Sequence, residues 1–100
     1  MGKVKLEVMP WITTQCGYNS PGNLIIEEEI EGGETIAQVI GKISVKRRPL
    51  GECILDRATQ AVHGYISIVL NDRLIPNTNT RNTRVRDGDV IKLFPTIDGG

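Results

Sequence analysis

The chain alternates apolar and polar residues in five short segments, which is the pattern of strands that bury one face. In the first segment, residues 3–8, the side chains of Val4, Leu6 and Val8 share a face. The second segment, residues 24–31, carries four glutamates. We expect it at a solvated edge of a sheet, where charge discourages pairing with other chains. The other predicted strands span residues 65–70, 73–76 and 90–94.

A change to helical spacing after the second segment predicts the main helix. Apolar residues recur there at i, i+3, i+4 and i+7, the stripe of a helix that packs on a sheet, namely Ile36, Val39, Ile40 and Ile43. Thr35 is placed to cap this helix, and Gln38 completes a capping box. A second, short helix is predicted within residues 52–63, with Gly64 as its terminating residue.

Three polar segments are predicted to be connections. Residues 10–23 are rich in Pro, Gly and Asn and predict a loop, whose Trp11 we expect to fold back on the core. Residues 44–51 are predicted to be a solvated basic connector, because a short charge run usually faces water. Residues 77–84 contain only Asn, Thr and Arg and predict a polar loop.

The alternation in the last predicted strand defines its register. Ile91 and Leu93 face the core, whereas Phe94 falls on the opposite face. Pro95 has no amide hydrogen, so the sheet should end near it. Residues 3–8 and this last strand alternate most regularly, and we therefore place them side by side and parallel in the middle. The pattern alone supports an α+β domain with one mixed sheet and a helix on one face.

Composition narrows the class of protein. One hundred residues make one domain, and twelve basic residues balance twelve acidic ones, which argues against a nucleic-acid partner. No apolar run approaches the roughly 20 residues that cross a bilayer, and no secretory leader is evident, so we expect a cytoplasmic protein without a membrane partner. In that compartment Cys16 and Cys53 are expected to be reduced.

No arrangement of residues in the sequence indicates catalysis. The two cysteines and the single histidine, His63, are too few and too far apart for a zinc site or a four-cysteine cluster. No triad and no pair of carboxylates with catalytic spacing is evident. We therefore expect no metal and no bound cofactor, and a carrier or binding module in place of an enzyme.

The residues after Pro95 continue no strand pattern. We divide the chain into a domain of residues 1–95 and a flexible tail of residues 96–100 that ends in Gly99 and Gly100. Two glycines enter a slot too narrow for any Cβ atom and adopt whatever backbone angles the slot demands. By themselves they also fit an ordinary frayed terminus.

The residues around this tail resemble those of the ubiquitin-like sulfur-carrier family, which includes the small subunit of molybdopterin synthase and the thiamine-pathway sulfur carrier. The matching motifs keep the family's spacing and are Asp87-Gly88-Asp89, Leu93-Phe94-Pro95 and Gly99-Gly100. The resemblance is specific only in the last thirty residues. It implies a β-grasp (ubiquitin-like) fold, a mixed sheet with one main helix and a second short helix.

The resemblance also implies a chemistry for Gly100. A ubiquitin-activating-type adenylyltransferase, using ATP and magnesium that the partner binds, would join the Gly100 carboxylate to AMP. Sulfur from a sulfurtransferase would displace AMP and leave a thiocarboxylate. An acceptor synthase subunit would then take this sulfur into a cofactor of the molybdopterin or thiamine type.

Three residues are predicted to form a docking patch beside the tail. In the family, the positions that match Leu74 and Phe94 lie at the partner surface, and Ile97 extends the same patch. Other functions stay open. The chain is alternatively a ubiquitin-like modifier conjugated to lysines through Gly100, a β-grasp interaction module whose glycines have no role, or a small enzyme of unrecognised type.

Overall fold

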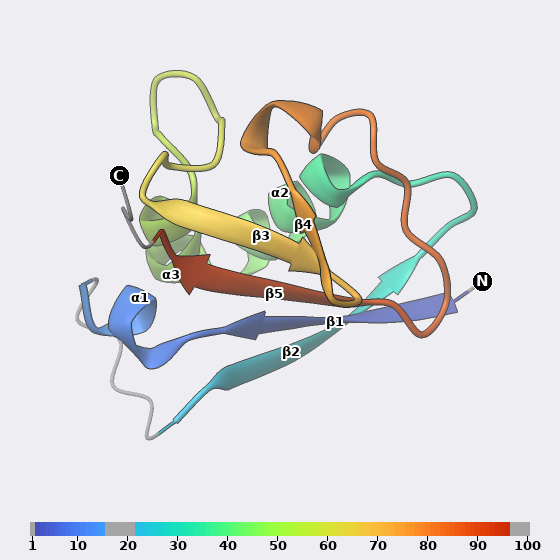
Figure 1. Cartoon of the computed structure of the whole chain (residues 1–100), viewed down its shortest axis with the longest axis horizontal. Coiled ribbons are helices and arrows are strands. Elements are labelled where there is room, and N and C mark those ends of the chain that lie inside the picture. The colour runs from blue at the N-terminus through green and yellow to red at the C-terminus, as the bar shows by residue number, and fades with distance from the viewer. Residues whose placement is uncertain (1, 16–21, 97–100) are drawn as a thin grey trace.

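The structure is a computed structural model that describes residues 2–15 and 22–96. Five strands form one mixed sheet in the order β2-β1-β5-β3-β4, and helices cover one face of it (Figure 1). The elements in chain order are β1 (Gly2–Val8), α1 (Pro10–Gln15), β2 (Leu24–Ile30), α2 (Ile36–Lys46), α3 (Arg48–Ile54), β3 (Ile66–Leu70), β4 (Arg73–Ile75), the short 3₁₀ helix η1 (Asn77–Asn79) and β5 (Val90–Pro95).

The central pair of the sheet is parallel, as the strand pattern predicted. Lys5 lies opposite Val90, and Val8 lies opposite Leu93. The two flanking pairings, of β2 with β1 and of β3 with β5, are antiparallel. A mixed sheet in this order, with a helix crossing between the first and second hairpins, is the β-grasp fold, and the expected fold class is confirmed.

The core lies between the sheet and α2. The alternating residues of β1 and β5 are almost completely buried, and they meet the stripe of isoleucines and valine predicted on α2. The capping box also forms, since the Thr35 hydroxyl accepts a hydrogen bond from the Gln38 amide (3.2 Å) and the Gln38 side chain accepts one from the Thr35 amide (2.9 Å). The predicted start of the helix is therefore confirmed.

The segment after β1 is a helix and not the predicted loop. Pro10 begins α1, because the first helical position needs no amide donor, and the Thr13 hydroxyl donates to the Pro10 carbonyl (2.9 Å). A helix of six residues buries only one side, and Ile12 and Thr13 occupy it. The expectation for Trp11 is wrong, because its side chain stays 48% exposed.

The second helix lies earlier than predicted. The predicted basic connector is helical, since residues 44–46 end α2 and residues 48–51 begin α3, which has Pro49 in its first turn. Residues 55–63 are not helical. The Asp56 carboxylate accepts hydrogen bonds from the amides of Thr59 (3.0 Å) and Ala58 (2.9 Å). These bonds lower the pKa of Asp56 and hold a turn that competes with helix formation.

The expected chemical state of the cysteines also needs a correction. Cys53 lies at the buried side of α3 and is disulfide-bonded, whereas the sequence suggested a reduced thiol. Cys16 lies outside the described residues.

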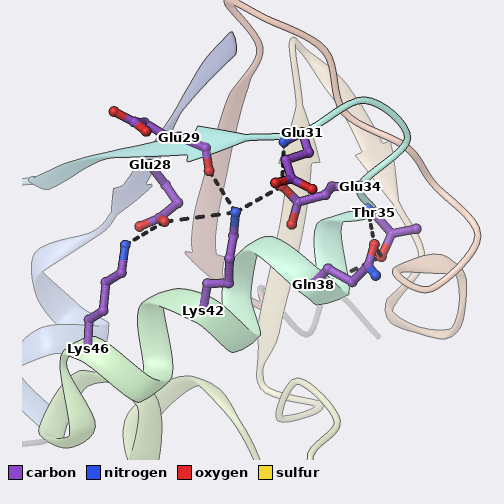
Figure 2. Close-up of polar contacts among 8 residues, drawn as sticks. All are labelled: Glu28, Glu29, Glu31, Glu34, Thr35, Gln38, Lys42 and Lys46. Atoms are coloured by element: carbon purple, nitrogen blue, oxygen red, sulfur yellow. Dashed lines mark hydrogen bonds and ion pairs between the residues drawn. The ribbon is translucent and has the colours of Figure 1, made fainter. Parts of the chain in front are cut away.

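The acidic strand β2 is an edge strand, as predicted, but it is not solvated on both faces. Glu28 is only 5% exposed and points toward α2, where its carboxylate lies 2.7 Å from Nζ of Lys46 and 3.9 Å from Nζ of Lys42 (Figure 2). Lys42 also donates to the Glu29 carbonyl (2.6 Å). Lys42 thus covers a carbonyl of the open sheet edge, which hinders the addition of another strand there.

Candidate functional site

The turn that leads into β5 is tied to the first strand. Gly88 adopts a positive φ of 87°, which a glycine tolerates without strain. The Asp87 carboxylate accepts a hydrogen bond from the Lys3 amide (2.8 Å), and the Gly88 amide donates to the Lys3 carbonyl (2.8 Å). The first two residues of the Asp-Gly-Asp motif therefore fix where β5 begins beside β1.

The third residue of the motif binds the hairpin between β3 and β4. One oxygen of Asp89 accepts from the Asn71 side chain (2.7 Å) and the other from the Arg86 amide (2.8 Å). Asn71 in turn accepts from the Val90 amide (2.9 Å). The sequence indicated the motif and a turn at Asn71, but not the contact between Asn71 and Asp89. The motif sets the register of β5 and hence where the chain leaves the sheet.

The chain leaves the sheet at the start of β3. The Thr96 amide donates to the Tyr65 carbonyl (2.7 Å), and the Thr96 hydroxyl donates to the Gly64 carbonyl (3.2 Å). A second contact joins the hydroxyls of Thr96 and Ser67 at 3.1 Å. Thr96, which we grouped with the tail, is thus held on β3.

The described part of the predicted docking patch lies on the face of the sheet opposite the helices. Leu74 is 66% exposed and lies opposite Val69, and Phe94, half-buried, lies opposite Ser67. The buried pattern of Ile91 and Leu93 confirms that Phe94 faces away from the core. Ile97, Gly99 and Gly100 lie outside the described residues, so their roles stay predictions.

We call the point at Thr96, where the chain leaves the sheet, the exit. An aromatic cluster that the sequence did not reveal lies beside it. The Trp11 and Tyr65 rings meet edge to face with centroids 6.1 Å apart, and the His63 and Tyr65 rings stack at 4.9 Å. The Tyr65 hydroxyl donates to the Cys53 carbonyl (3.1 Å). The sequence did not indicate this cluster, because we predicted a loop at Trp11. In the structure Trp11 lies in the helix α1, which places its ring beside Tyr65.

A separate cluster of polar groups forms around Lys42 of α2, where this helix faces the edge strand β2. The Lys42 ammonium bonds the Glu34 carboxylate (2.9 Å), which, with the backbone hydrogen bond from Glu31, lowers the pKa of Glu34 (Figure 2). Within the described residues, no buried side-chain polar atom lacks a partner, and no group of acidic, His or Cys side chains suits a metal ion. The Lys42 ammonium and the Glu28 and Glu34 carboxylates are thus paired with one another or with Lys46.

No helix in residues 2–15 and 22–96 combines the length and the apolar character that crossing a bilayer requires. The Asp-Gly-Asp turn and the hydrogen bonds of Thr96 fix both ends of β5, within one mixed β-grasp sheet. The molecule is therefore, by its fold, a ubiquitin-like protein. The profile of the ThiS family matches residues 22–100, and the chain belongs to that family.

Comparison with known proteins gives similar relatives. The sulfur carrier protein CysO of Mycobacterium tuberculosis is 25% identical over 69 residues, which cover 68% of this chain and 74% of that protein. The structure of small archaeal modifier protein 1 from Methanosarcina acetivorans superimposes with a TM-score of 0.68 at 22% identity, covering 100% of this chain and 98% of that one.

A further similar structure comes from a complex. Subunits 1 and 2 of the molybdopterin-converting factor from Helicobacter pylori were solved together, and the matching chain gives a TM-score of 0.53 at 26% identity. The match covers 98% of this chain and 99% of that one. The relatives thus include proteins described as carriers, modifiers and subunits.

Proposed function

We propose that the protein is a sulfur carrier that is adenylated at Gly100 and converted there to a thiocarboxylate. Membership of the ThiS family supports the proposal. The observation that carries it is the exit itself, where the Asp-Gly-Asp turn fixes β5 and Thr96, three residues before Gly99, is hydrogen-bonded to Tyr65 and Gly64 beside β3. A rigid body that presents a short glycine-ended peptide suits a carrier, because the partner handles the peptide alone.

The chemistry takes place on the carbonyl carbon of Gly100. Its carboxylate oxygen attacks the α-phosphorus of ATP, and pyrophosphate leaves. The resulting acyl-adenylate turns an inert carboxylate into an electrophile. Sulfide then attacks the carbonyl carbon and expels AMP, which leaves the thiocarboxylate. If a sulfurtransferase persulfide attacks instead, the product is an acyl disulfide, and a second thiol must reduce it to release the thiocarboxylate.

In this proposal the partner enzymes supply the nucleotide, the metal ion and the sulfur. ATP and magnesium bind to the ubiquitin-activating-type adenylyltransferase, and the carrier binds no cofactor of its own. Leu74 and Phe94, with Ile97 from the tail, dock on this enzyme and afterwards on the acceptor synthase subunit. Val69 extends the apolar surface between them, since it lies opposite Leu74 on the same face. The acceptor makes a sulfur-containing cofactor, of the molybdopterin or thiamine type.

One second function has an observation in its favour. The fold matches small archaeal modifier protein 1 along the whole chain, and a modifier would use the same adenylate to form an isopeptide bond with lysine. The two functions diverge only after adenylation, because the nucleophile is sulfur in one case and an amine in the other.

Mass spectrometry of the protein purified from its native cells tests both. A carrier gains the mass difference between sulfur and oxygen at Gly100, and an alkylating reagent then adds the mass of its alkyl group to the thiocarboxylate sulfur. A modifier appears as larger conjugates in which Gly100 is joined to a lysine, and trypsin, which cleaves after Lys92, leaves residues 93–100 on that lysine. If neither species forms, and no adenylate forms with ATP and a cognate activating enzyme, the proposed function is wrong.

A further inference from the structure

We propose that Trp11, Tyr65 and His63, the aromatic cluster at the exit, form a second docking surface for the adenylyltransferase that acts on Gly100. This inference rests on the proposed function and adds a contact on a different part of the molecule from Leu74 and Phe94. The partner surface that meets Trp11 and Tyr65 is apolar, and Trp11 provides the largest share of this contact.

The short distance between the exit and Gly100 is the first reason. Gly100 lies four residues beyond Thr96, and four extended residues span at most about 14 Å. Thr96 is itself fixed by its hydrogen bonds to Tyr65 and Gly64. Any globular enzyme that brings its catalytic groups to the Gly100 carbonyl must therefore approach the surface around Thr96 closely.

The aromatic cluster is part of that surface. The backbone of Tyr65 holds Thr96, so the Tyr65 ring lies at the base of the tail. Trp11 reaches the same place because Met9, at the end of β1, donates to the Leu93 carbonyl (3.2 Å), and α1 begins at the next residue. Figure 1 shows α1 and the chain exit at the same end of the sheet.

The chemistry of the cluster defines the partner surface. Trp11 and Tyr65 are 48% and 42% exposed, which leaves large ring areas in water. The Tyr65 hydroxyl already donates to the Cys53 carbonyl, so Tyr65 offers its ring outward and not a hydrogen bond. Neither α1 nor residues 64–67 contain a charged side chain. A surface complementary to the Trp11 and Tyr65 rings is therefore apolar, whereas His63, at the side of the cluster, interacts with the Asp56 carboxylate.

The cluster is also arranged before any partner arrives. The three rings hold one another through an edge-to-face contact and a stacked contact, and such pairs are favourable beyond the area they bury. Little side-chain freedom remains to be lost on binding, which raises affinity. Tryptophan and tyrosine in this situation are the residue types that dominate binding energy in protein interfaces.

Substitution of Trp11 tests the proposal in the full chain with its cognate adenylyltransferase. We expect Trp11→Ala to raise the Kd of the complex, and the KM for carrier in ATP–pyrophosphate exchange, by about tenfold. The kcat should change little, because Trp11 does not touch the reacting atoms. Val45→Ala is the matched control, since Val45 is 74% exposed on α2, and it should leave both constants unchanged.

A Kd for Trp11→Ala within twofold of the unaltered protein, with normal circular dichroism, overturns the inference.

Trp11 is the one tryptophan of the chain, so a label on tryptophan reports directly whether the enzyme contacts this residue. Protein made with fluorotryptophan shows one fluorine NMR signal, which should shift or broaden when unlabelled enzyme is added. A signal that stays still while Gly100 becomes adenylated overturns this inference and leaves the proposed function intact. A signal that moves with the protein's own concentration assigns the cluster to contacts between copies and also overturns it. Absence of any adenylation of the unaltered protein refutes the proposed function itself.

Discussion

At the scale of single residues, the most informative side chain is Asp89. Its two oxygens join the Asn71 side chain and the Arg86 amide, and so connect the β3–β4 hairpin to the start of β5. Sequence comparison with a family treats this residue as part of a motif. The structure gives it a physical task, which is to fix the register of the strand that leads to the tail.

Asp89→Ala should lower the free energy of unfolding by about 1–2 kcal/mol, because two hydrogen bonds to a charged group are lost at an exposed site. Glu27→Ala, on the exposed face of β2, should change it by less than about 0.5 kcal/mol. Urea denaturation of both variants measures the difference. Equal stability of the two variants would show that Asp89 does not fix β5.

Phe94 and Leu93 are adjacent residues that should respond oppositely to a charge. Leu93→Asp places an unpaired carboxylate in the core, where it is fully buried, and should unfold the domain. Phe94→Asp should leave the fold intact and weaken binding to the adenylyltransferase or the acceptor subunit. Circular dichroism and a binding assay separate the two effects, and an unfolded Phe94→Asp protein would contradict the outward register.

Glu34 gives the stability a dependence on pH. The hydrogen bond from Lys42, followed by that from the Glu31 amide, lowers the pKa of Glu34 below its ordinary 4.5 in the folded state. A lowered folded-state pKa means that the contribution is complete above 4.5 and is lost as the pH falls through the folded-state pKa.

Glu34→Gln should therefore be less stable than the unaltered protein at neutral pH, and the difference should shrink in acid. Thermal melts at neutral pH and at a series of acidic pH values below the ordinary 4.5 check this. A difference that stays constant across these conditions would mean that the charge of Glu34 is not involved.

At the scale of elements, the close packing of α2 against α3 depends on one glycine. A Cβ atom at Gly51 would lie 2.6 Å from Cβ and 2.8 Å from Cα of Ser44, whereas one at Gly41 would meet nothing within 4 Å. Both residues are helical, so their helix propensities favour alanine equally. The two positions differ only in the space around them.

Gly51→Ala should therefore destabilise the domain by about 1–3 kcal/mol, as overpacking does, while Gly41→Ala should stabilise it by about 0.5–1 kcal/mol. Chemical denaturation of this pair gives effects of opposite sign. The same sign in both variants would mean that α3 shifts easily and that the contact is not tight.

The elements also show what sequence can and cannot predict. Every strand, the register of β5 and the start of α2 followed from alternation and capping, because these signals are local. The helix α1 was missed, since six residues show less than two turns of periodicity. The second helix was displaced, because Asp56 captures two amides at the point where apolar spacing favoured a continuing helix.

Only one part of the candidate site, the residues around Phe94 and the tail, was predicted from the sequence, and the aromatic cluster was not. The outward side of Phe94 followed from alternation, whereas the docking role of Leu74 and the role of the Gly-Gly tail came from the family resemblance and stay predictions. The aromatic cluster joins Trp11 to Tyr65, which lie more than fifty residues apart, and nothing local pairs them. Only the parallel pairing of β1 with β5, which brings α1 to the exit, puts the two rings together.

At the scale of the whole molecule, the body and the tail are expected to be independent. Removing Gly99 and Gly100 should abolish adenylation and leave the melting temperature unchanged, because the last described residue, Thr96, is already anchored. Changing Gly99 to Val should have the same effect on adenylation if the partner's slot excludes a Cβ atom. A melting temperature that falls by several degrees on the deletion would show that the tail supports the fold.

The position of β5 in the sheet has a consequence for synthesis in the cell. It lies between β1 and β3, yet it is made more than eighty residues after β1. A nascent chain cannot close its sheet until this strand leaves the ribosome, and such distant pairing slows folding. A chain that stops early lacks its middle strand and exposes apolar edges to degradation. Folding thus acts as a quality check, because a chain folds only if synthesis has reached the strand that precedes the tail.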